Sequence, residues 1–202
     1  MLGMAEADSL ELHSIMVLKD GYVIYENWMG AGHADSLHIL NSVSKTYTSL
    51  AIGMAIEEGK LKLDDKLVSF FPDKLPDIVS GHLAAITVRD LLSMTCGHAV
   101  DHTYEMQQLA KENPRPDWVK QFLSYLVEFA PGEVYCYNSV GTFMLSAILQ
   151  KITGQTLFDY LTPRLFEPLG IKGACWLENN EGVNYGGWGC TSRPRTSPRP
   201  GN

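Results

Sequence analysis

The sequence lacks the features that mark membrane, metal and nucleotide-binding proteins. It has no run of about 20 apolar residues, so no segment is predicted to span a membrane. There is no zinc-type Cys/His spacing, no glycine-rich phosphate loop after a strand and no nucleotide fingerprint. Positive charge is in deficit, since the formal net charge is −7, which argues against a nucleic-acid partner. We therefore expect no cofactor and no nucleic acid.

Cysteine is also scarce, and its positions do not suggest cross-links. The 202 residues include four cysteines, Cys96, Cys136, Cys175 and Cys190. Their wide and irregular spacing, in a chain of this length, is unlike a disulfide framework. We expect these thiols to be free and mostly buried.

A metal site is not predicted either. His98 and His102 are four residues apart, a spacing that suits two metal ligands on one helix. Gly97 argues against such a helix, and no third ligand accompanies the pair. Because the stretch is polar and contains Pro114 and Pro116, residues 98–116 are predicted to form a surface excursion.

The two ends of the chain differ in composition from its middle. The middle is rich enough in apolar residues for one sizeable domain or a large part of one. Residues 1–8 lack the charged and apolar regions of a signal peptide, so no export signal is expected in this chain. From Cys190 onward there are three arginines and three prolines, with no acidic and no large apolar residue. A segment of this kind buries little surface, which predicts a disordered tail over residues 190–202.

Hydrophobic patterning and turn residues predict the elements between these ends. β-rich runs on either side of Asp20-Gly21 predict a hairpin over residues 14–29. Thr87 and Asp90 form a weak capping box for a helix that stops at Gly97. Other helices are expected over residues 42–58, 116–129, 140–152 and 156–166, the last with Pro163 inside it.

The helix at residues 42–58 opens with Ser-x-x-Lys, formed by Ser42 and Lys45. Positions three apart lie one turn above each other on a helix, which puts the serine hydroxyl within reach of the lysine amine. A serine hydroxyl needs a base to become a nucleophile, and a desolvated lysine can serve as that base. The pattern is loose, and the alternative interpretation is an ordinary helix start with a solvated lysine.

A second candidate segment comprises Tyr137, Asn138 and Ser139. Tyr-x-Ser is uninformative alone, because residues 47–49 fit it equally well. Here, however, a Pro-Gly turn precedes the motif and an apolar helix follows it. A packed loop tyrosine and a helix cap are the structural alternative.

Taken together, these segments resemble the serine β-lactamase and penicillin-binding-protein superfamily. The similarity is greatest to its class C-like serine hydrolases, which include esterases, D-amino-acid peptidases and 6-aminohexanoate-oligomer hydrolases. The matching segments follow the family's order, at residues 41–46, 59–65, 86–97, 131–139, 152–156 and 165–171. The resemblance implies an α+β fold of the β-lactamase/transpeptidase type, incomplete over residues 1–189. It would comprise a helical subdomain from Leu61 to about Ile171 and a partial antiparallel sheet.

The resemblance also implies roles for five residues. Ser42 would be the nucleophile that forms an acyl-enzyme, and Lys45 would activate it. Tyr137 would carry the proton to the leaving group or share the role of base. Ser139, where many members have asparagine, would orient the substrate or Lys45, and Asn138 would also contact the substrate. The substrate would be a small-molecule ester, amide, peptide or β-lactam, and members are often periplasmic or secreted.

One family motif, a Lys-Thr-Gly or His-x-Gly strand that follows Tyr137, has no counterpart in this sequence. The C-terminal strands that carry it are missing too, so we expect weak or no turnover. Residues 186–189 resemble a family segment that usually continues with Leu-x-Leu-Thr. A reading-frame shift at Cys190 is the hypothesis for the tail. Two other interpretations stay open: a noncatalytic module that binds peptide or cell wall, and a non-functional gene fragment.

Overall fold

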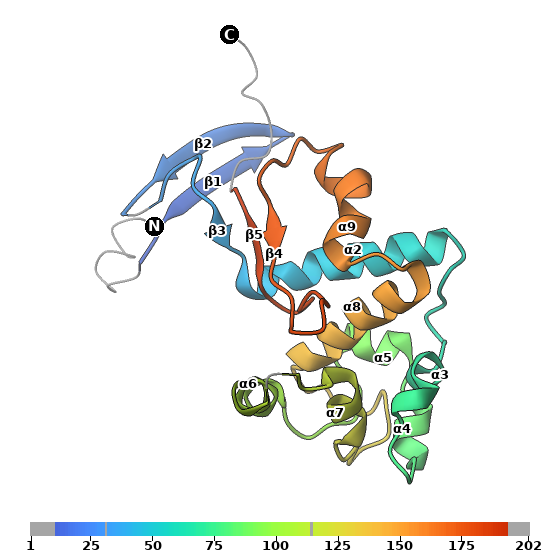
Figure 1. The fold of residues 1–202 in the computed structure, drawn as a ribbon. Coiled ribbons are helices and arrows are strands. Elements are labelled where there is room, and N and C mark those ends of the chain that lie inside the picture. Colours follow the sequence, from blue (N-terminus) through green and yellow to red (C-terminus); the bar gives the residue numbers. More distant parts are fainter. Residues whose placement is uncertain (1–10, 31, 114, 194–202) are drawn as a thin grey trace.

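The computed structural model describes residues 11–193, except residues 31 and 114. Helices account for more of the described chain than strands do, and the strands gather at one end (Figure 1). The strands belong to two small sheets, a hairpin of β1 and β2 and a three-stranded sheet ordered β3-β5-β4. This is the α+β arrangement predicted, with a helical subdomain and a partial antiparallel sheet.

The N-terminal hairpin forms where the Asp-Gly pair predicts it. Strand β1 (Ser14–Lys19) pairs antiparallel with β2 (Tyr22–Trp28). Asp20 and Gly21 have φ angles of 49° and 82°, the two positive values that a tight two-residue hairpin turn requires. The hairpin prediction is therefore confirmed, together with its physical reason.

The second sheet corrects the expected start of the disordered tail. Strand β5 (Cys190–Ser192) lies between β3 (His38–Ile39) and β4 (Cys175–Trp176) and pairs antiparallel with both. Cys190 is fully buried, and its carbonyl accepts a hydrogen bond of 2.9 Å from Leu40 N. The prediction counted large apolar side chains, whereas backbone pairing and a buried thiol order this segment. Residues 194–202 of the predicted tail lie outside the described residues.

Two long helices dominate the fold. Helix α2 (Ser44–Glu57) follows a 3-10 turn, η1 (Asn41–Val43), and α8 (Ser139–Thr153) ends at Gly154, which has a φ of 70°. The remaining helices are short: α3 (Leu67–Phe70), α4 (Gly81–Ala85), α5 (Val88–Ser93), α6 (Thr103–Glu112), α7 (Trp118–Ser124) and α9 (Leu157–Leu161). Two further turns are η2 (Pro72–Lys74) and a π-helical turn, η3 (Thr162–Phe166). None of the helices within the described ranges is long and apolar enough to cross a membrane.

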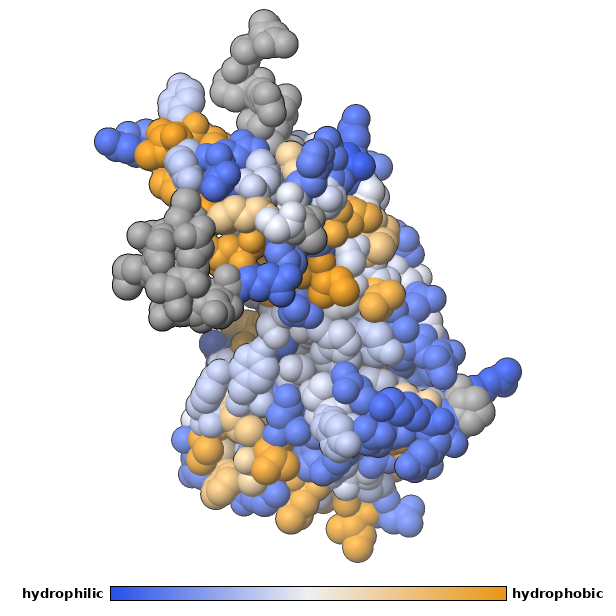
Figure 2. Space-filling model, turned by 90° about the vertical axis from the view of Figure 1, so that its left-hand side faces the viewer, coloured by the Kyte–Doolittle hydropathy of each residue, from blue (hydrophilic) through white to orange (hydrophobic). Residues whose placement is uncertain are grey.

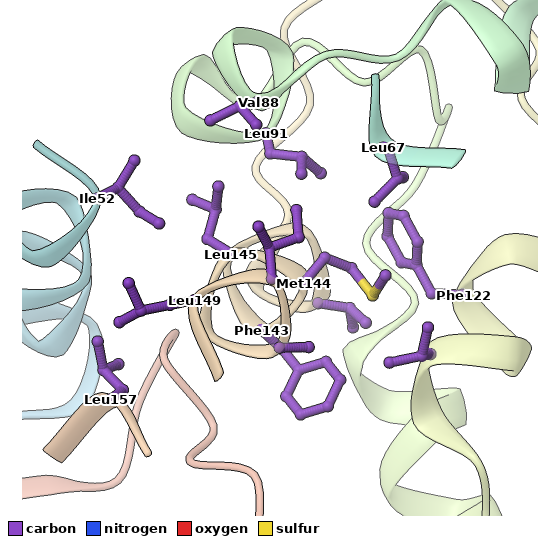
Figure 3. Close-up of a cluster of buried hydrophobic side chains, with 14 of the residues drawn as sticks. Ile52, Leu67, Val88, Leu91, Phe122, Phe143, Met144, Leu145, Leu149 and Leu157 are labelled. Atoms are coloured by element: carbon purple, nitrogen blue, oxygen red, sulfur yellow. The ribbon is translucent and has the colours of Figure 1, made fainter. Parts of the chain in front are cut away.

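Helix α8 lies at the centre of the hydrophobic core. Figure 3 shows Phe143, Met144, Leu145 and Leu149 pointing outward from it into the surrounding helices. Their neighbours come from α2, α3, α5, α7 and α9, and include Ile52, Leu67, Val88, Leu91, Phe122 and Leu157. A helix buried on all sides is held rigidly by packing. The first turn of α8 is therefore a fixed platform, and it carries Ser139.

Local helix predictions are partly confirmed. The capping box at Thr87 and Asp90 is formed in both directions, and α5 follows it. The predicted surface excursion at residues 98–116 is wrong in part, because α6 forms there with Met106 fully buried. The helix expected over 116–129 ends at Ser124, since the following chain is extended and Phe129 N bonds to Gly97 O at 2.9 Å.

Apolar side chains are exposed on the β1–β2 hairpin. Figure 2 shows hydrophobic residues gathered at the hairpin end of the molecule. The exposed ones are Val17, Leu18, Tyr22, Val23, Ile24 and Tyr25. Among the described strands, β1 and β2 pair only with each other. The sequence led us to expect this of a partial sheet.

The cysteines and histidines do not form a metal or disulfide site. All four cysteines are free; Cys96 and Cys190 are buried, Cys136 is half-buried and Cys175 is exposed. No cluster of three or more metal-ligating side chains occurs within residues 11–193 as described. His98 is instead a core residue, 1% exposed, with its ring 5.0 Å from the ring of Phe122.

We predict that His98 makes the protein sensitive to acid. Burial lowers the pKa of His98 to about 4, with a further contribution from His102, whereas Glu128 opposes the shift. In the unfolded chain His98 takes up a proton near pH 6.5, whereas in the folded chain it stays neutral until about pH 4. The free energy of unfolding therefore falls as the pH drops from about 6.5 towards 4. The expected loss is about 3 kcal/mol, measurable by urea unfolding at neutral and acidic pH.

The matched variants for this prediction are His98→Phe and His33→Phe. The first should remove much of the loss of stability on acidification, because no titratable ring is left at the buried position. The second changes an exposed histidine and should leave the pH dependence as in the wild type. Equal acid sensitivity in wild type and His98→Phe would contradict the role of His98.

Candidate active site

The candidate nucleophile lies on a tight turn ahead of helix α2. Ser42 is the middle residue of the 3-10 turn η1 and is exposed to solvent. Asn41, the residue before it, has a φ of 44°, in the left-handed region that asparagine tolerates better than most residues. Residues in sparsely populated backbone conformations cluster at functional sites. The turn presents the Ser42 hydroxyl outward while Ser44 and Thr48 anchor the helix below it.

Lys45 reaches three oxygen atoms from three separate parts of the chain. Its Nζ donates to Ser42 Oγ at 3.3 Å, to Ser139 Oγ at 3.1 Å and to the carbonyl oxygen of Gly187 at 2.7 Å. An ammonium group has three hydrogens and no acceptor, so these contacts use its full hydrogen-bonding capacity. The proximity of Ser42 and Lys45 thus agrees with the helical spacing in the sequence. The shortest contact, to Gly187, was not anticipated.

Tyr137 completes the contacts of the serine hydroxyl. Its Oη donates to Ser42 Oγ at 2.7 Å, and Lys45 Nζ lies 4.8 Å from the centre of its ring. Partial burial alone would raise the pKa of Tyr137. Hydrogen bonding to Lys45 and Ser42, together with the lysine charge, outweighs burial, and the net pKa lies below 10.0. Tyr137 is therefore easier to deprotonate than a free phenol.

Ser139 and Asn138 lie at the start of α8 but differ in their roles. Ser139 is almost buried, and its hydroxyl faces Lys45. Asn138 is 2% exposed, and its Oδ1 accepts a hydrogen bond of 2.7 Å from Gly141 N, which makes it the N-cap of α8. The side chain of Asn138 is thus buried and engaged at the helix end, and its contact with substrate stays a prediction. Asn138 supports the platform that carries Ser139.

The segment from Gly186 to Cys190 also borders the site, although its sequence indicated only a family resemblance. Besides the Gly187 contact, Thr48 Oγ1 donates to Gly186 O at 2.8 Å, and Cys190 N donates to Ser44 Oγ at 3.2 Å. The signal that was available is the Gly186-Gly187 pair, since adjacent glycines permit close backbone approach.

The fold defines the class of protein, that of the β-lactamase/transpeptidase-like proteins. The particular family follows from comparison with known sequences. The model of the beta-lactamase family matches residues 3–201, nearly the whole chain, so the protein belongs to the beta-lactamase family. The resemblance inferred from the sequence motifs is thereby confirmed.

Individual relatives are distant and longer. Protein flp of Staphylococcus aureus (strain MW2) is 27% identical over 175 residues, which span 83% of this chain and 35% of that protein. Among solved structures, a Bacillus anthracis protein assigned as a 6-aminohexanoate-dimer hydrolase aligns with a TM-score of 0.77 at 18% identity, over 94% of this chain and 53% of that one. An octameric penicillin-binding protein homologue from Pyrococcus abyssi aligns with a TM-score of 0.68 at 23% identity, over 89% of this chain and 49% of that one. The chain therefore spans about a third of the curated relative and half of the solved ones.

Proposed function

We propose that this protein is a serine hydrolase that forms an acyl-enzyme at Ser42. The observation that carries the proposal is the convergence on Ser42 Oγ of Tyr137 Oη at 2.7 Å and Lys45 Nζ at 3.3 Å. A serine hydroxyl placed between a phenol of lowered pKa and an ammonium has both a proton acceptor and a stabilising charge. Membership of the beta-lactamase family supports a hydrolase of this kind.

Acyl transfer would start with the Ser42 proton. Tyr137, as the phenolate, accepts that proton while Ser42 Oγ forms a bond to the substrate carbonyl carbon. The tetrahedral intermediate collapses when the bond to the leaving group breaks and Tyr137 returns the proton to that group. Lys45 stays an ammonium throughout and stabilises the phenolate through its positive charge. Water then attacks the acyl-serine by the reverse sequence, which releases the acid and restores Ser42.

The oxyanion would lie near the start of η1. The first N–H groups of a helical turn have no partner within the helix, and Ser42 N–H is one of these groups. It would donate to the developing oxyanion of the tetrahedral intermediate. The chain spans about half the length of the solved relatives. We therefore propose only a substrate class, an ester, amide or peptide, and no particular compound.

The test is covalent labelling of the 202-residue chain with a fluorophosphonate and with a fluorescent penicillin. We expect a single adduct by intact-mass spectrometry, which peptide mapping places on Ser42. Ser42→Ala should abolish it, whereas Ser49→Ala, which changes an exposed serine on the following helix α2, should label as the wild type does. Labelling that survives Ser42→Ala would contradict the proposal.

A chain that takes no label has two distinguishable explanations. A cooperative thermal unfolding transition without an adduct would favour the noncatalytic binding module, in which the site only holds a ligand. A broad transition with exposed apolar surface would favour a gene fragment that folds poorly. Either result would overturn the assignment of Ser42 as a working nucleophile in this chain.

A further inference from the structure

The segment Gly186 to Cys190 crosses the first turns of both long helices. Its backbone bonds to side chains on three positions of α2, at Ser44, Lys45 and Thr48. Ser44 and Thr48 are fully buried, so two of these contacts are shielded from water. Hydrogen bonds shielded from water persist, because the unpaired groups would lose their hydration. The segment is therefore fixed against α2 next to the candidate nucleophile.

Glycine is required for this close approach. A Cβ added to Gly187 would lie 2.8 Å from the carbonyl oxygen of Ser139 and 3.3 Å from its Cβ. A Cβ added to Gly186, whose φ is 66°, would lie 2.8 Å from the carbonyl oxygen of Thr142. Both obstacles belong to the first turns of α8, the most deeply buried helix, which cannot move aside. Any side chain here must push the segment away from the site.

We propose that the Gly187 carbonyl is a positioning group for Lys45, held in place by the Gly186–Thr48 contact. At 2.7 Å it is the closest of the three oxygens around the lysine, and it is the only backbone atom among them. It accepts but cannot donate, so it takes one N–H of Lys45 and fixes the direction of the remaining two N–H groups. Those groups then point at Ser42 and Ser139.

This inference rests on the proposed function and adds a role for a residue that never touches the substrate. A lysine side chain has four rotatable bonds and loses considerable freedom when it is held in one geometry. Ser42 and Ser139 are both neutral hydroxyls with other partners available. The carbonyl supplies a third, fixed partner that anchors the ammonium. Without it, Lys45 would sample positions in which its charge no longer faces Tyr137 and Ser42.

The primary variant is Gly187→Ala, and Gly53→Ala is its control. Gly53 lies on α2, and an added Cβ there would meet no atom within 4 Å, so its replacement should leave the labelling rate unchanged. For Gly187→Ala we expect the maximal rate of Ser42 labelling by fluorophosphonate to fall roughly 10- to 100-fold, as for a catalytic group displaced by about 1 Å. The reagent concentration that gives half the maximal rate should stay unchanged, because binding of the reagent does not involve Gly187.

A second pair of variants covers the case in which Gly187→Ala does not fold. Thr48→Val keeps the shape of the side chain and removes the hydroxyl that holds Gly186 O. Thr48→Ser keeps that hydroxyl and should restore the labelling rate that Thr48→Val lowers. A purely structural role for Thr48 would change the melting temperature and leave the rate per folded molecule unchanged.

An NMR signal separates failure of this inference from failure of the proposed function. The Nζ hydrogens of Lys45, assigned by loss of their signal in Lys45→Met, should exchange slowly in the wild type and rapidly in Gly187→Ala and Thr48→Val. Slow exchange in a wild type that takes no label would overturn the proposed function but retain the anchor. Rapid exchange in the wild type, or unchanged exchange and labelling in both variants, would overturn the anchor.

Discussion

Lys45→Met should slow acylation of Ser42 by about 10³-fold, in the middle of the range for a group that assists proton transfer. Methionine has a similar length and no charge, so it fills the space without the three N–H donors. Ser42 Oγ and Ser139 Oγ lose a partner, and the phenolate of Tyr137 loses its counter-ion. The measurement is the rate of fluorophosphonate adduct formation by intact mass.

Two controls make the Lys45 result specific. Lys151→Met removes a lysine that is exposed in the last turn of α8, and it should label at the wild-type rate. Lys45→Arg keeps the charge but presents a planar group with a different donor geometry, so it should restore little activity. A Lys45→Met protein that folds and labels at the wild-type rate would show that the lysine is only a structural neighbour of Ser42.

Features set by neighbouring residues were predictable from the sequence. The hairpin follows from Asp20-Gly21, whose backbone conformation is decided within the turn itself. The start of α5 follows from the capping box between Thr87 and Asp90, three residues apart. The proximity of Ser42 and Lys45 follows from the same spacing. Each case involves a chemical preference that acts over one turn of chain.

Features that depend on distant segments were not predictable in the same way. The contact between Lys45 and Gly187 joins positions 142 residues apart, and no local pattern in either segment indicates it. Strand β5 is another case, because Cys190–Ser192 has no strand-like pattern and is ordered by β3 and β4 on either side. The cap contact of Asn138 is local but was not predicted either, because a motif gives residue types without orientation, and this side chain bonds to the end of helix α8.

The position of Tyr137 and Ser139 shows how far family resemblance extended the local argument. Tyr-x-Ser occurs elsewhere in the chain, so the pattern alone selected no site. The resemblance singled out residues 137–139, and the structure brings Tyr137 Oη within 2.7 Å of Ser42 Oγ across 95 residues of sequence. What brings them together is the burial of α8 against α2, a property of the whole core. The roles of these residues in a reaction stay predictions.

Tyr137→Phe should reduce the acylation rate by about 10²- to 10³-fold and should also change its dependence on pH. In the wild type the phenol must lose its proton before it can accept that of Ser42. The labelling rate should therefore rise with pH and level off above the pKa of Tyr137, which lies below 10.0. Phenylalanine has no ionisable group, so the remaining slow reaction should lack this rise.

Tyr135→Phe is the matched control, since Tyr135 is two residues away and 66% exposed, with its hydroxyl near Met94 and not near Ser42. It should keep both the rate and the pH profile of the wild type. The combination of Tyr137→Phe with Lys45→Met adds a further constraint. If the lysine acts by stabilising the phenolate, its loss should matter little once the phenol is gone, so the two effects should not multiply. Independent, multiplying effects would contradict a lysine that acts through the phenolate, and with it the proposed division of roles between the two residues.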